Sequence, residues 1–198
     1  MALTGGGYDA VRPVLYLDPA NGRLHMVAAS LDNAPFVYYA SSTDQGGQWS
    51  PAQAVDPNEY PDSSGNTRYA AVHANGSNIY IVARTVDQTL WTKYYTTFVR
   101  STNGGQDWTD HEKLASWTAF LSGEYGLSLA GVGDRLYMGY EVGGGLYFRE
   151  YTGVPWGDNT WVDLGETGAW PSITQATDGQ AWMMWEDGGS LKMRHYDG

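Results

Sequence analysis

The sequence predicts an all-β protein built of successive four-stranded antiparallel meanders, and three observations support this. Short apolar runs recur along the 198 residues, and Gly, Asn or Asp turns follow them. These residues tolerate the positive φ angles of tight hairpins. A sustained 3.6-residue apolar period is missing, although residues 113–121 could form a helical turn. The composition, with 42% hydrophobic residues, 9 Trp and 15 Tyr, is that of a packed chain.

The apolar runs align into four repeats. Their first strands begin at Arg12, Arg68, Tyr125 and Trp170, so the repeats start about 45 to 57 residues apart. This spacing fits one four-stranded sheet per repeat and leaves no room for crossover helices. We therefore expect a β-propeller with about four blades in this chain, the last one incomplete. The repeats span about residues 8–60, 61–117, 118–165 and 166–198, and residues 1–198 are expected to form a single propeller domain or a propeller fragment.

Two turn motifs occupy the same place in the first two repeats. One reads Ser-Thr-Asp-Gln-Gly-Gly-Gln-Trp from Ser42, and the other reads Ser-Thr-Asn-Gly-Gly-Gln-Asp-Trp from Ser101. In such a turn the Asp or Asn side chain can accept hydrogen bonds from turn amides, and Gly can take the left-handed conformation. The Trp can close over the turn. The residues expected to build these turns are Ser42, Asp44, Gly46, Trp49, Ser101, Asn103, Gly105 and Trp108.

This motif resembles the Asp-box, or BNR repeat, of sialidases and related propellers, and the resemblance covers nearly the whole chain at the level of repeats. The third repeat keeps a degenerate version between Tyr151 and Trp161, and the fourth reaches only Tyr196–Gly198, where the box would begin. A second segment, Val11–Tyr16, looks like the sialidase Arg-Ile-Pro segment without its Ile. In that family this Arg helps to clamp the substrate carboxylate, which implies the same role for Arg12.

The resemblance also implies what a complete sialidase would need. That family uses about six blades, three clamping Arg residues, a Tyr nucleophile paired with a Glu, and an Asp acid/base. Four repeats cannot carry this set in its usual order.

In an antiparallel meander, the start of the first strand and the end of the second lie on one edge, opposite the Asp-box turns. Arg forks suit a carboxylate and aromatic rings stack on sugars, so an anionic glycan is the expected ligand of this edge. The candidate substrate-binding residues are Arg12, Arg68, Arg84 and Trp170. The candidate catalytic residues are Tyr125, Glu141 and Glu186, with Asp32, Asp87 and Asp187 as candidate general acids. Alternatively, the Arg and Glu residues neutralise one another and the aromatic rings pack between blades.

Several classes of site are disfavoured. A net charge of −11 without a basic cluster argues against nucleic acid. With no Cys there is neither a disulfide nor a thiolate site. His25, His73, His111 and His195 lack ligand spacing, so no metal site and no cofactor are expected, although structural Ca²⁺ is conceivable. Asp18, Asp134 and Asp178 are expected to be exposed turn residues. No apolar stretch is long enough for a membrane span.

Three functions remain open. The leading hypothesis is a sialidase-like propeller that binds carbohydrate without full catalytic machinery. The alternatives are an active exo-sialidase or glycoside hydrolase, and a structural repeat module of a larger surface or phage protein. Residues 1–10 could supply the missing strand of the last repeat and close a four-bladed ring. As an unpaired blade edge can also pair with another chain, a homo-oligomer or a longer propeller is expected instead. An extracellular or cell-surface location is favoured, although residues 1–7 show no export signal.

Overall fold

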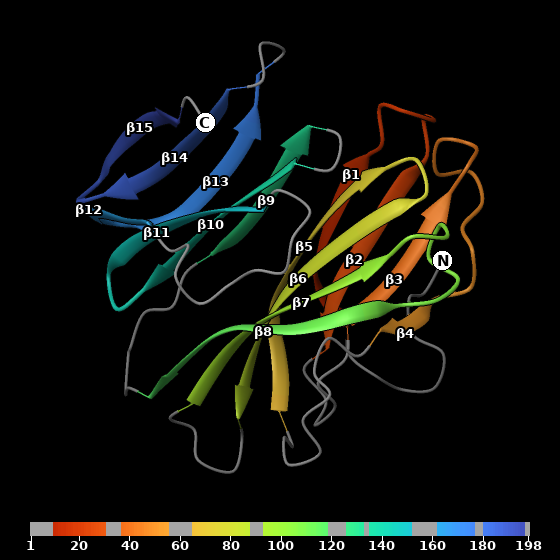
Figure 1. The fold of residues 1–198 in the computed structure, drawn as a ribbon, viewed down its shortest axis with the longest axis horizontal. Helices are drawn as coiled ribbons and strands as arrows, with labels where there is room; N and C mark the ends of the chain where they lie inside the picture. The colour runs from red at the N-terminus through yellow and green to blue at the C-terminus, as the bar shows by residue number, and fades with distance from the viewer. Residues whose placement is uncertain are drawn as a thin grey trace. The chain divides into compact units, whose positions relative to one another are not determined.

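A computed structural model describes residues 10–30, 37–55, 65–87, 93–118, 126–132, 135–151, 162–176 and 180–196. Every regular element in these ranges is a β-strand (Figure 1). Within them, no helix long and apolar enough to cross a membrane occurs. The chain divides into two compact units, Met1–Ala119 and Phe120–Gly198, and each is described by itself.

The first unit contains two four-stranded antiparallel meanders (Figure 1). The strands of the first sheet are β1 (Ala10–Leu17), β2 (Leu24–Ser30), β3 (Val37–Ser42) and β4 (Gln53–Val55). Those of the second sheet are β5 (Gly65–Asn75), β6 (Asn78–Asp87), β7 (Lys93–Ser101) and β8 (Thr109–Thr118). One buried core joins the two sheets, with Val27 and Tyr39 from the first and Ile79, Ile81 and Val99 from the second.

The second unit repeats this plan. Its four-stranded sheet consists of β9 (Leu127–Val132), β10 (Arg135–Val142), β11 (Gly145–Tyr151) and β12 (Val162–Thr167). Its three-stranded sheet consists of β13 (Ala169–Gln175), β14 (Ala181–Asp187) and β15 (Ser190–Tyr196). The shared core places Tyr137 and Phe148 against Ile173, Met183 and Trp185.

The predicted all-β meander architecture is confirmed, including a last sheet with three strands in the described residues. Strand β14 shows why the sequence folds this way, since Ala181, Met183 and Trp185 are buried and the residues between them are not. The helical turn considered for residues 113–121 is wrong over residues 113–118, which belong to β8 and pair with β7. The single-domain assignment stays a prediction.

The two sheets of the second unit approach closely at Gly139 in β10. A Cβ atom there would lie 2.8 Å from Cδ1 of Ile173 and 2.9 Å from Sδ of Met183. Both distances are well below van der Waals contact. The missing side chain therefore lets β13 and β14 pack directly on the backbone of β10.

Asp18 is fully buried, so its expected role as an exposed turn residue is wrong. Its carboxylate accepts hydrogen bonds from the amides of Ala20 and Gly76, both at 2.8 Å. Gly76 belongs to the β5–β6 turn, and Asn21 donates to its carbonyl oxygen at 3.3 Å. Asp18 thus ties the first turns of two neighbouring sheets together. Asp134 and Asp178 lie outside the described residues.

His25 is a buried titratable group in the core of the first unit. Its Nδ1 lies 2.9 Å from the Tyr39 hydroxyl, and the side chain has no exposed surface. Burial lowers the pKa of His25 to about 4, against a smaller opposing effect of the Asp18 charge. The imidazole is therefore neutral in the folded protein at neutral pH.

We expect Gly139→Ala to lower the free energy of unfolding by about 1–3 kcal/mol, because the added methyl group must displace Ile173 and Met183. Urea denaturation measures this change. Removing Cδ1 with Ile173→Val should recover part of the loss in the double variant. Strictly additive losses would show that the two residues do not compete for this space.

Stability should fall as pH drops from about 6.5 to about 4, because the unfolded chain protonates His25 before the folded chain does. Between pH 7 and pH 4.5 the contribution of His25 is about 2–3 kcal/mol. Denaturation of the wild type and of His25→Gln at both pH values isolates the contribution of His25. The carboxylates also titrate in this range, but they are common to both proteins and cancel in the comparison. Equal losses in the two proteins would contradict this assignment.

Candidate functional site

Arg12 and Trp170 adopt the same unusual backbone conformation at equivalent places, the starts of β1 and β13. Their φ angles are 53° and 56°, and each residue precedes a proline. Strand register shifts across both positions, as at a β-bulge. A non-glycine residue in this region costs about 1–3 kcal/mol and is retained where surrounding contacts hold it, often at functional sites. Both side chains are exposed.

In the first unit, Arg12 meets the second sheet at this edge. Its guanidinium carbon lies 4.4 Å from the ring centroid of Tyr69, a cation–π contact. Tyr69 pairs with Arg84, which is 1% exposed. Arg68 lies in β5 at a register shift between Thr67 and Tyr69, and its side chain is outside the described part of the structure. The edge thus brings together Arg12, Tyr69 and Arg84.

In the second unit, Trp170 stands at the corresponding edge and is 55% exposed. The chain beside it is tightly packed, because a Cβ atom on Gly126 would lie 2.8 Å from Cδ of Pro171. Gly126 immediately precedes β9, so the starts of β9 and β13 are in contact. Tyr125, the candidate nucleophile, lies outside the described residues.

The two candidate catalytic glutamates form the same local contact. Oε1 of Glu141 accepts a hydrogen bond from the amide of Gly144 at 2.6 Å, and Oε1 of Glu186 accepts one from Gly189 at 2.5 Å. Both belong to a Glu-x-Gly-Gly turn, in β10–β11 and β14–β15. Each glutamate stabilises its own hairpin. The repetition of this tetrapeptide is the sequence signal for that role, and the sequence reasoning did not use it.

The surroundings of the candidate general acids give little indication of an acid/base role. Asp187 forms an ion pair with Nζ of Lys192 at 2.5 Å and lies 3.5 Å from the Thr167 hydroxyl. Asp87 ends strand β6, but its side chain is not among those described, and Asp32 falls outside the described residues.

The two Asp-box-like turns have the same pattern of hydrogen bonds. Each lies at the edge of its sheet opposite the start of the first strand. Ser42 Oγ donates to Asp44 at 2.7 Å and accepts from the amide of Gly46 at 2.9 Å. Asp44 accepts from the amide of Gln48 at 2.7 Å, and this bond, followed by that of Ser42, lowers the pKa of Asp44. Gly46 is left-handed, with φ of 92°. The Trp49 indole donates to its carbonyl oxygen at 3.2 Å.

The second turn uses Asn in place of Asp. Ser101 Oγ lies 2.9 Å from Oδ1 of Asn103 and accepts from the amide of Gly105 at 2.9 Å. Asn103 accepts from the amide of Asp107, also at 2.9 Å. Trp108 meets the Tyr39 ring edge-on at 5.1 Å between centroids. The hydrogen bonds are local and hold the turn, while the buried Nε1 of Trp108 has no hydrogen-bond partner among the described residues.

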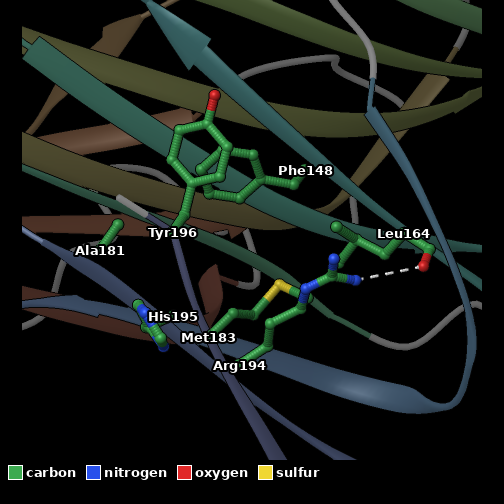
Figure 2. Close-up of a pocket in the computed structure, with 7 residues that line it drawn as sticks. All are labelled: Phe148, Leu164, Ala181, Met183, Arg194, His195 and Tyr196. Carbon is green, nitrogen blue, oxygen red and sulfur yellow. Dashed lines mark hydrogen bonds between the residues drawn. The ribbon is translucent and has the colours of Figure 1, made fainter. Parts of the chain in front are cut away.

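A cavity of about 90 Å³ opens between the two sheets of the second unit (Figure 2). It lies near the start of β14 and the end of β15, away from Trp170, Glu141 and Glu186. Its lining residues are Phe148, Leu164, Ala181, Met183, Arg194, His195 and Tyr196. The described part of the chain contains no group of three His, Cys, Asp or Glu side chains arranged to hold a metal ion.

No protein-family model matches this sequence, and no match to a curated protein was found. Among solved structures, an α-L-arabinofuranosidase from Fusarium graminearum with an iminosugar inhibitor gives a TM-score of 0.67 at 11% identity, covering 96% of this chain and 63% of that one. The six-bladed β-propeller lectin of Aleuria aurantia gives 0.56 at 15% identity, covering 96% and 59%. The chain has a β-propeller fold.

A third propeller extends the comparison to the sialidases. The intramolecular trans-sialidase of Ruminococcus gnavus gives a TM-score of 0.51 at 17% identity, covering 88% of this chain and 40% of its own. The chain spans less than two thirds of the length of each of these propellers.

Replacing Arg12 with Gly should yield a protein about 1 kcal/mol more stable than replacement with Ala, because only Gly adopts a φ near 53° without strain. Both variants lack the guanidinium, so their difference reports the backbone alone. The same comparison at Trp170 should give the same sign. Thermal or urea unfolding of the four variants measures it, and Ala variants as stable as the Gly variants would show that the bulges are unstrained.

Proposed function

We propose that this chain is a sialidase-like Asp-box propeller that binds an anionic glycan without full catalytic machinery. Within each unit the proposed site is the edge where the first strands begin, with Arg12 in the first unit and Trp170 in the second. The observation that carries the proposal is the strained backbone of these two residues. Each sits in a left-handed conformation that costs stability, yet each points a large side chain into solvent. A fold that needed only packing here would be better served by glycine.

The side chains at this edge suit an acidic sugar. Arg12 supplies an exposed planar cation, held over the face of Tyr69. Such a guanidinium can form two parallel hydrogen bonds with a carboxylate. Arg84 lies in register beside Tyr69 and adds positive charge from within the sheet. In the second unit, Trp170 offers an exposed indole of the kind that stacks on pyranose rings.

Binding is favoured over hydrolysis by the position of the glutamates. Glu141 and Glu186 each accept a hydrogen bond from their own turn, so neither is poised as a general base in the described structure. Asp187 is likewise held by Lys192. The similar propellers also support a carbohydrate ligand, since their names describe an arabinofuranosidase, a fucose-recognising lectin and a trans-sialidase.

Homo-oligomerisation, or inclusion in a longer propeller, stays a proposal. Its support is the face of the last sheet that carries Met184, Leu191 and Met193, which are 43%, 81% and 60% exposed. The corresponding residues of β2 and β3 in the first sheet, Val27, Val37 and Tyr39, are buried beneath β5 and β6. An uncovered apolar sheet face of this kind is typical of an interaction surface.

Sialyllactose immobilised on a sensor surface should retain the wild-type protein, and lactose should not. Arg12→Ala should weaken retention through the first unit and Trp170→Ala retention through the second, since each removes the direct contact of its own unit. The double variant should therefore lose retention at least tenfold. Arg135→Ala is the matched control, because it removes an exposed Arg at the opposite edge. Light scattering on the same samples gives the oligomeric state of each variant, so that the retained mass can be compared per chain.

Retention of the double variant equal to that of Arg135→Ala would contradict the proposed sites. Turnover of a fluorogenic sialoside by the wild type would show that the protein is an enzyme and not only a binding protein.

A further inference from the structure

The two sheets of the first unit are irregular at the same edge, and one contact joins the two irregular strands. The register of β1 shifts between Val11 and Val14, and that of β5 shifts between Thr67 and Tyr69. Between these two positions, the guanidinium carbon of Arg12 lies 4.4 Å from the ring centroid of Tyr69. The contact therefore joins the sheets where both backbones depart from the regular ladder.

The backbone at Arg12 is held in a conformation that serves this contact. Its φ of 53° departs from regular strand geometry, and Pro13 follows with a ring that fixes its own φ. A strained residue of this kind persists where the surrounding structure holds it. Glycine would relieve the strain but would remove the side chain that reaches Tyr69. The bulge thus costs stability and places a cation on an aromatic ring of the next sheet.

Tyr69 is a firm support for that cation. Its side chain is half-buried, and its register partner in β6 is Arg84, which is 1% exposed. The register partner of Arg84 in β7 is Thr96, which is fully buried. Cross-strand partners lie on the same face of a sheet, so Tyr69 ends a row of packed side chains that runs from β7 through β6.

Contact with the ring affects how Arg12 can meet a ligand. A guanidinium carries its five N–H donors in its own plane, so contact through its face does not consume them. An exposed Arg samples many rotamers, and a ligand that fixes one of them bears an entropy cost. The aromatic face restricts those rotamers beforehand. Tyr69 therefore lowers the entropy cost of presenting the Arg12 fork to a carboxylate.

We propose that Tyr69 is a positioning residue of the glycan site in the first unit, where it holds the Arg12 guanidinium ready for the carboxylate of an acidic sugar. This role rests on the proposed function and adds a residue that was not among those predicted from the sequence. Tyr69 acts through Arg12, so its aromatic face is the group that matters and its hydroxyl is not.

The first measurement needs no ligand. The Nε–Hε resonance of Arg12 in ¹⁵N-labelled protein is assigned by its absence in Arg12→Lys. Because the guanidinium lies over the ring, this proton should resonate at lower frequency in the wild type than in Tyr69→Leu. Tyr69→Phe keeps the ring and should keep the wild-type frequency. Tyr69→Met is a second variant without a ring and should behave as Tyr69→Leu does.

The second measurement is retention on immobilised sialyllactose. All variants carry Trp170→Ala as well, so that retention reports the first unit alone. Tyr69→Leu and Tyr69→Met should each weaken retention about two- to fivefold, the range that corresponds to an exposed cation–π contact. Tyr69→Phe should restore the retention of Trp170→Ala alone. Thermal unfolding of every variant shows that the compared proteins are folded.

An unmoved Arg12 resonance in both variants without a ring would overturn the proposal. So would retention by these folded variants equal to that of Trp170→Ala alone, or equal losses in Tyr69→Phe and Tyr69→Leu, which would assign the effect to the hydroxyl. If the wild type itself is not retained on sialyllactose, the proposed function fails and this role fails with it. Retention of the wild type with no effect of Tyr69→Leu overturns only the role of Tyr69, so the two failures give different results.

Discussion

In each unit, the first sheet has an apolar face that must be covered, and the next sheet along the chain covers it. Val27 and Tyr39 are buried by Ile79 and Ile81 of the following sheet. In the second unit Ile173 and Met183 sit so close to β10 that Gly139 has no room for a side chain. Because strand order, turn position and register must all preserve this contact, the two edges of every sheet acquire fixed and different environments.

The two edges of a sheet differ in how the backbone is held. At the edge that carries the Asp-box-like turns, side chains of Ser42, Asp44 and their equivalents satisfy turn amides, and these bonds hold the left-handed Gln45 and Gly46 in place. At the opposite edge, bulges hold Arg12 and Trp170 in costly conformations. The stability supplied by the first edge and by the core allows the second to carry strain.

The repeats provide an internal standard, since equivalent positions share backbone geometry but not side chains. The end of the second strand carries Arg84 in one sheet and turn-bound glutamates in two others. Trp108 packs against Tyr39 in the first unit, whereas the equivalent place in the second unit holds Tyr196 and a cavity, with Ala181 in place of Ile79. Because the sheets share strand order, such differences between equivalent positions come largely from side-chain size and charge.

The alternation of apolar residues and the turn residues were sufficient to predict the meanders and the order of strands within each sheet. They also predicted the edge of its sheet on which Arg12 lies, and likewise for Trp170, because these features depend on residues near one another in the chain. Tertiary structure alone decided that Asp18 is buried against the Gly76 turn and that Arg12 and Trp170 are left-handed. It likewise decided that a cavity lies beside Phe148. Burial, strain and cavities depend on which distant segments pack together, and no local pattern encodes that packing.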